Sequence, residues 1–61
     1  HEGEDSRVGM TGEAQTDLHP SGKAEIDGEI VDVVVEGGFA QKGDAVRIIK
    51  EDGIGILVKK V

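Results

Sequence analysis

The chain has 61 residues, so it is expected to form one domain with a thin core, because a chain of this size buries only about 60% of the surface that its unfolded form exposes. It carries 7 basic and 13 acidic residues, and Phe39 is its only Phe, Tyr or Trp. An acidic surface with one aromatic ring neither attracts phosphate backbones nor stacks bases, which argues against nucleic-acid binding. The absence of cysteine excludes disulfides and thiolate metal sites. The apolar runs are far shorter than the roughly 18 residues of a membrane-spanning helix.

The beginning of the chain divides into a polar tail and a first strand. Residues 1–7 contain no apolar side chain, so we expect a solvated tail or linker, with the folded domain at 8–61. Val8 to Leu18 carries spaced apolar residues interrupted by Gly9 and Gly12. Two glycines weaken a helix but mark bends in a barrel strand, so this segment is predicted to be a bent strand.

The strongest local signal is the hairpin around Asp27-Gly28. A turn at His19-Pro20-Ser21-Gly22 precedes it. A two-residue turn at 27–28 makes the numbers of paired residues sum to about 55, so Ala24 faces Val31 and Lys23 faces Asp32. The inward face of this hairpin is then apolar and the outward face is charged; the inward residues are Ala24, Ile26, Val31, Val33 and Val35.

A second hairpin is expected after a corner at Gly37-Gly38. Phe39 is predicted to be a structural anchor that plugs one end of the barrel, and 39–42 to form a helical turn or an irregular loop. The next strand starts at 42–44, and Asp52-Gly53 turns the chain into a last strand over 54–61. With paired numbers summing to about 105, Ile48 faces Leu57 and Ile49 faces Ile56. The outward apolar set is then Ile49, Ile54 and Ile56, with Val58 as a further candidate.

Five strands in this order predict an all-β fold, a small OB-like barrel. Few of its residues are candidates for a catalytic, metal or cofactor site. Ser21 and Lys23 resemble a Ser-Lys pair, but a lysine opposite Asp32 keeps its charge, so a turn role is favoured for Ser21. The acids of the first hairpin lack the spacing of a calcium loop and are interpreted as a solvated face; they are Glu25, Asp27, Glu29 and Asp32. His19 has no second ligand at metal spacing, and no glycine motif for a nucleotide is present, so no metal or cofactor is expected.

Two segments resemble a known family. They read TGEAQTDLHPSGKAEIDGE and EGGFAQKGDAVRI, and the most specific part is Leu-x-Pro-Ser-Gly-Lys at its distance from Asp27-Gly28. They resemble the C-terminal soluble domain of the NfeD family of membrane proteins, over about Val8 to Val61. The resemblance implies an OB fold joined to membrane helices in the parent protein, and a stomatin- or prohibitin-like partner. It also implies a role in regulating membrane proteases or in membrane quality control. His19 and Val35 depart from the family pattern, where Arg and a polar residue are common.

The favoured hypothesis is a non-enzymatic interaction domain that uses Ile49, Ile54 and Ile56 as contacts. The partner is a stomatin- or prohibitin-like protein or the parent's own membrane helices. The alternative is a biotinyl or lipoyl carrier module, because residues 33–46 also resemble the turn of those domains. Such carriers display a modified lysine on a hairpin, and the corresponding place here is Glu51-Asp52-Gly53, so the alternative lacks its reactive residue.

Overall fold

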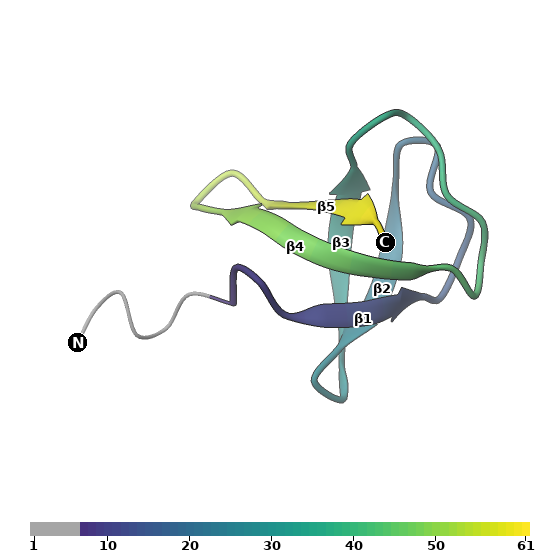
Figure 1. Cartoon of the computed structure of the whole chain (residues 1–61). Coiled ribbons are helices and arrows are strands. Elements are labelled where there is room, and N and C mark those ends of the chain that lie inside the picture. Colours follow the sequence, from purple (N-terminus) through teal and green to yellow (C-terminus); the bar gives the residue numbers. More distant parts are fainter. Residues whose placement is uncertain (1–6) are drawn as a thin grey trace.

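The computed structural model describes residues 7–61, which form a closed five-stranded barrel (Figure 1). The strands are β1 (Thr11–Ala14), β2 (Ser21–Ile26), β3 (Glu29–Val35), β4 (Ala45–Glu51) and β5 (Ile56–Lys60). Around the barrel their order is β1-β2-β3-β5-β4, and β4 returns to β1. Every pairing is antiparallel except β3 with β5, which run parallel. The predicted all-β, OB-like barrel is confirmed.

The core consists of inward side chains at alternate positions of the strands, together with Leu18 and Ala40 from the loops. Ten apolar residues are at most 2% exposed, namely Ala14, Leu18, Ala24, Ile26, Val33, Val35, Ala40, Val46, Ile48 and Val58. Met10, Val31 and Ile56 pack against them while partly buried. No helix within residues 7–61 is long and apolar enough to cross a bilayer.

The first hairpin has the predicted register. Ala24 pairs with Val31 and Lys23 with Asp32, and the numbers of every pair from Ser21↔Val34 onward sum to 55. Asp27 and Gly28 both have positive φ, 54° and 80°, as a two-residue turn of the I′ type requires. The alternation of apolar and charged residues and the turn chemistry therefore specify the same pairing.

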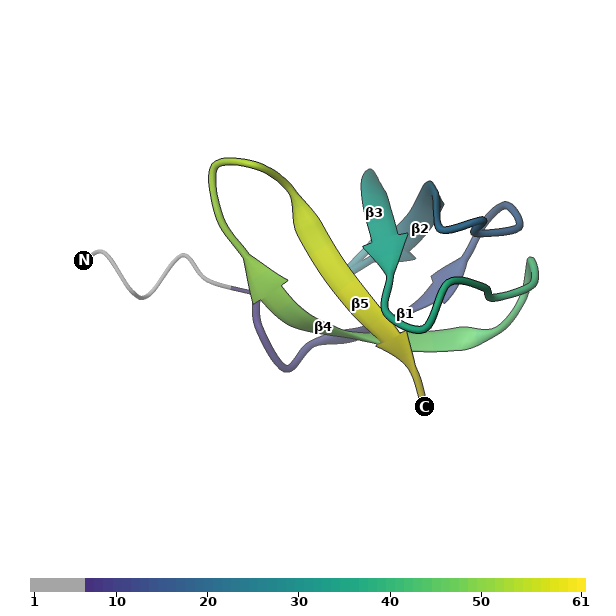
Figure 2. The ribbon, with the colours of Figure 1, turned by 90° about the horizontal axis from the view of Figure 1, so that it is seen from above.

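The second hairpin has a different register from the predicted one. Strands β4 and β5 are joined by a loop at one end (Figure 2). In their ladder Ile48 pairs with Val58 and Lys50 with Leu57, so a bulge lies at Ile49. A bulge places an extra residue on one strand and shifts the alternation of everything beyond it. Val58 is consequently in the core, and Leu57, predicted to face inward opposite Ile48, is half-buried and pairs with Lys50. The predicted sum of 105 is wrong because it assumed a two-residue turn and an unbroken ladder, whereas residues 52–55 separate the paired Glu51 and Ile56, and the sum of paired numbers changes from 107 to 106 across the bulge.

Phe39 is not the predicted plug. Its side chain is 43% exposed, whereas the neighbouring Ala40 is fully buried and forms an isolated bridge with Leu18. The Phe39 ring instead makes an edge contact with the ring of His19, with centroids 4.6 Å apart. The chain turns at the predicted corner, where Gly37 and Gly38 both adopt positive φ. Residues 39–42 form an irregular loop, one of the two forms expected.

The first strand is shorter than predicted. Val8 to Leu18 does not form one bent strand, since β1 spans only Thr11–Ala14 and the chain then leaves the ladder before Leu18 bonds to Ala40. Residues 1–6 of the predicted tail lie outside the described residues. Arg7, the last residue of that tail, contacts the barrel: its backbone N–H donates to Glu51 Oε1 at 2.9 Å.

Candidate docking surface

The loop between β4 and β5 is closed by its own first residue. The Asp52 Oδ1 atom accepts hydrogen bonds from the backbone N–H groups of Ile54, at 2.8 Å, and Gly55, at 3.2 Å. The Asp52 N–H donates in turn to the Gly55 carbonyl oxygen at 3.1 Å. These two N–H donors hold the pKa of Asp52 below its usual value. The sequence folds this way because Asp favours hydrogen bonds to the backbone N–H groups two or three residues on.

This loop holds the Ile54 side chain exposed to solvent. The Ile54 side chain is 97% exposed at the tip of the hairpin. It is flanked by glycines, and its neighbour Ile56 turns back to pack partly against the core. A large apolar side chain that is held in place by a hydrogen-bonded loop yet buries almost nothing contributes little to folding.

Beside the tip, β3 and β5 bring two more apolar side chains together. Val34 pairs with Leu57 in the short parallel ladder; Val34 is exposed and Leu57 is half-buried. Val34 is 41% exposed, and its antiparallel partner in β2 is the polar Ser21. It is thus an apolar side chain on the charged outer face of the first hairpin. We call Val34, Ile54, Ile56 and Leu57 the hairpin patch.

Two open hollows meet at the hairpin patch. The larger, about 480 Å³, lies between the loop and the β2–β3 hairpin, and the smaller, about 230 Å³, lies toward Lys50. Residues of the larger hollow are Thr16, Ser21, Gly22, Lys23, Asp32, Val33, Val34, Ile54, Gly55 and Ile56. Those of the smaller one are Val34, Lys50, Asp52, Ile54, Gly55, Ile56 and Leu57. The apolar residues that line both hollows are Val34, Ile54 and Ile56, while Leu57 lines only the smaller one.

The charges around the hairpin patch are paired. Lys23 forms an ion pair with Asp32, and Lys50 lies 3.8 Å from Asp52. The Lys23 amine, which the sequence places near Ser21, is engaged by the Asp32 carboxylate. Within residues 7–61, no three His, Asp or Glu side chains gather as a metal site would require. The hairpin patch is thus an apolar surface whose charged neighbours are paired with one another.

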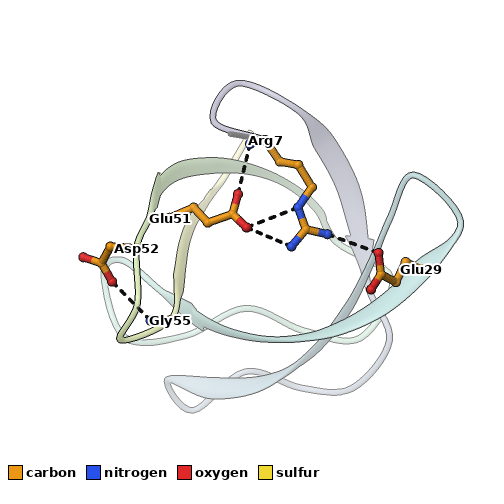
Figure 3. A network of polar contacts seen from close by, with 5 residues as sticks. All are labelled: Arg7, Glu29, Glu51, Asp52 and Gly55. Atoms are coloured by element: carbon orange, nitrogen blue, oxygen red, sulfur yellow. Dashed lines mark hydrogen bonds and ion pairs between the residues drawn. The ribbon is translucent and has the colours of Figure 1, made fainter. Parts of the chain in front are cut away.

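An arginine joins the hairpin to the beginning of the described chain (Figure 3). Arg7 Nη2 donates to Glu51 Oε2 at 2.8 Å and its Nε to the same oxygen at 3.3 Å, while Nη1 donates to Glu29 Oε1 at 3.3 Å. The side-chain hydrogen bonds from Arg7 to Glu51, followed by the one from the Arg7 backbone N–H, hold the pKa of Glu51 below its usual value. The Arg7 clamp therefore links the start of β3 to the end of β4, directly before the loop that carries Ile54.

The structure brings together only part of the predicted contact set. Ile54 and Ile56 line both hollows, whereas Ile49, half-buried at the bulge, lines neither. Val34 and Leu57 were missed. An apolar residue on the charged face of the first hairpin marks Val34 in the sequence, but Leu57 cannot be found without the bulge. The Arg7 clamp was also missed, because no pattern links residue 7 to residue 51.

The chain is similar to known proteins. The model of the family described as NfeD-like C-terminal, partner-binding domain matches residues 4–60. Membrane protein NfeD1b of Bacillus subtilis (strain 168) is 43% identical over 54 residues, which are 88% of this chain and 12% of that protein. The chain thus corresponds to a small part of that relative.

Two solved structures share the fold. The C-terminal domain of stomatin operon partner protein 1510-C from Pyrococcus horikoshii has a TM-score of 0.84 and 27% identity, over 90% of this chain and 88% of that one. The soluble domain of a membrane protein implicated in regulation of membrane protease activity, from Corynebacterium glutamicum, has a TM-score of 0.78 and 25% identity. This second match covers 90% of this chain and 94% of that one.

Proposed function

Because the chain belongs to the NfeD family, as an NfeD-like C-terminal, partner-binding domain, we propose that it binds a protein partner through the hairpin patch. The observation that carries this proposal is Ile54, which the Asp52 loop holds almost fully exposed beside Val34 and Leu57. Burying such a side chain on association is worth roughly 1.5–3 kcal/mol. Since the loop already fixes the backbone, less ordering entropy is lost on binding.

The partner that we propose is a stomatin- or prohibitin-like membrane protein. Support comes from the names of the two structural neighbours, one a stomatin operon partner and the other implicated in regulation of membrane protease activity. In this proposal the domain belongs to a membrane protein and acts in protease regulation or membrane quality control. The parent's own membrane helices are the second candidate partner.

We propose further that the domain itself is not catalytic. Its family is described by partner binding, and Lys23, the only amine near Ser21 in sequence, is paired with Asp32. The carrier alternative is disfavoured by Lys50, which lies within β4 opposite Leu57 rather than at the tip of a hairpin. An attached cofactor arm needs a lysine at the tip, where this chain has Ile54.

The experiment is an NMR titration of the labelled domain with the soluble fragment of a stomatin-like protein from the same organism. We expect shifts at Val34, Ile54 and Leu57. The double variant Ile54→Thr with Leu57→Thr should weaken binding at least about tenfold, because two apolar side chains then bury less surface in the complex. Thr keeps the strand preference of both positions, so the fold is expected to persist.

Two single variants separate this surface from its rivals. Ile30→Thr changes an exposed apolar residue of β3 that lines neither hollow, and should leave binding unchanged. Ile49→Thr tests the contact set predicted from sequence. Unchanged binding by the double variant, or an equal loss with Ile30→Thr, would place the partner elsewhere on the barrel.

A further inference from the structure

The barrel closes through a short ladder between β3 and β5. These two strands pair only at Val34↔Leu57 and Val35↔Val58, whereas β3 pairs with β2 over residues 29–34. Residues 29–33 of β3 therefore have a neighbouring strand on one side only. We call residues 30–33 the open edge.

The direction of the backbone groups at the open edge follows from one hydrogen bond. The Val35 N–H donates to the Pro20 carbonyl oxygen of the preceding turn at 2.8 Å. In an antiparallel pair, residues bonded to the partner strand alternate with residues whose N–H and C=O groups point away from it. Val31 and Val33 therefore bond to β2, while Ile30 and Asp32 direct their backbone groups away from it. Within residues 7–61, no loop backbone bonds to these groups, and the ladder with β5 does not reach them.

The open edge borders the larger hollow of the hairpin patch. Residues 32–34 of β3 line this hollow of about 480 Å³ on one side, and residues 54–56 line it on the other. Toward the beginning of β3, the Arg7 clamp joins Glu51 to Glu29 (Figure 3). Unpaired backbone groups, exposed apolar side chains and a hollow thus lie next to one another.

The chemistry of the open edge indicates what would bind there. An edge with alternating free N–H and C=O groups is matched by another extended backbone, which offers both groups at the same spacing. The exposed side chains of Val34 and Ile54 beside the edge favour an apolar side chain on that backbone. Lys23 and Lys50, the cations of the two hollows, are already paired with acids, and the chain has a net charge of −6. A basic segment is therefore attracted more strongly than an acidic one.

We propose that the open edge binds an extended, basic segment of the partner as an added strand, with an apolar side chain against Val34 and Ile54. The inference rests on the proposed function, because it uses the hairpin patch and states how a partner engages it. In such recognition the main-chain hydrogen bonds supply affinity and the alternate side chains supply selectivity. Residues 29–33 span about 17 Å, which a segment of about five residues matches.

The first test uses the peptide acetyl-Lys-Val-Thr-Val-Thr-Lys-amide as the probe in an NMR titration of the labelled 61-residue chain. We expect shifts of the Asp32, Val34 and Ile54 amide signals. Two further peptides carry N-methyl groups, one on both valines and the other on both threonines. Because an added strand turns alternate N–H groups toward the edge, one methylated peptide should lose at least about tenfold in affinity and the other should bind like the parent peptide.

The second test changes the edge and uses the stomatin-like soluble fragment. Asp32→Pro removes an N–H that makes no bond to β2, and proline is tolerated where the N–H of an edge strand faces outward. We expect this variant to bind the fragment at least about tenfold more weakly. Asp32→Asn keeps the N–H and removes only the charge that pairs with Lys23, so it is the matched control and should bind like the wild type. Ile30→Thr also keeps the backbone and should have no effect.

Amide hydrogen exchange of the free chain checks the assumed edge directly. The Asp32 amide should exchange faster than those of Val31 and Val33, because only the latter two bond to β2. Far-ultraviolet circular dichroism shows whether Asp32→Pro folds, and the methylated peptides decide the question if it does not.

The outcomes separate this inference from the proposed function. Equal binding of the two methylated peptides, or no shifts at Asp32 and Val34 with about 5 mM peptide, would overturn the added strand. If the fragment bound Asp32→Pro like the wild type but lost the Ile54→Thr, Leu57→Thr double variant, the hairpin patch would stand and the added strand would fail. If the peptides behaved as expected and the fragment did not bind, the added strand would stand and the proposed partner would fail.

Discussion

The large side chain of Phe39 is exposed and the small one of Ala40 is buried, the reverse of what their sizes suggest. Phe39 is 43% exposed and touches His19, while Ala40 is fully buried against Leu18. Truncating Phe39 to Ala should therefore cost only about 1 kcal/mol, since part of its surface stays in water in the folded state. Leu18→Ala should cost about 2–5 kcal/mol, as expected for a core side chain. Urea unfolding of both variants checks this; a loss for Phe39→Ala as large as that for Leu18→Ala would show a buried ring.

Gly12 allows β1 and β2 to cross at close range. A Cβ atom there would lie 2.1 Å from the backbone oxygen of Glu25 and 2.6 Å from the Cδ1 atom of Ile26. Because a paired backbone cannot easily move away, Gly12→Ala is expected to destabilise the barrel by about 1–3 kcal/mol. Gly53→Ala is the matched control, since nothing lies within 4 Å of its Cβ position. Thermal unfolding should show a clear decrease for the first variant and little change for the second.

At the scale of elements, the Arg7 clamp makes the attachment of β4 dependent on pH. The Glu51 carboxylate accepts hydrogen bonds from Arg7, which lower its pKa from the ordinary value of 4.5. A carboxyl with a lowered pKa in the folded state stabilises the fold fully above its unfolded pKa, and loses that contribution as the pH falls through its folded pKa. The loss is therefore expected below about pH 4.5.

Glu51→Gln isolates this contribution. The variant should be less stable than the wild type at pH 7, and the difference should shrink as the pH falls toward 3, because the wild-type carboxyl then loses its charge too. Chemical denaturation across this pH range measures both. Asp32→Asn removes a carboxylate from an exposed ion pair and is the control. A difference between wild type and Glu51→Gln that does not change with pH would show that the clamp acts through packing and not through charge.

The two hairpins show what a sequence reveals about an element. Asp27-Gly28 and the alternation around it specify one register, and the structure has that register. The register of β4 and β5 is ambiguous, because the run Ile48-Ile49 has no polar residue to mark which member faces outward. The bulge at Ile49 decides this register. The local pattern of the sequence does not predict the bulge. The same one-residue shift explains why Leu57 was expected in the core.

On the scale of the whole molecule, strand number and fold class follow from short-range signals, but the surfaces do not. The hairpin patch needs the parallel ladder that joins Val34 to Leu57, two residues that are far apart in the sequence. The Arg7 clamp spans 44 positions. Such contacts depend on how the sheet closes, which turns and alternation alone do not specify.

The bulge at Ile49 also bears on how chains of this family can change length. Ile48 pairs with Val58 and Lys50 with Leu57, so deleting Ile49 would join the two parts of the ladder while every other pair keeps its partner. Deleting one residue inside β2 would instead turn all later side chains of that strand to the opposite face. Insertions and deletions of a single residue among relatives are therefore expected to accumulate in the middle of β4 and to be absent from β2.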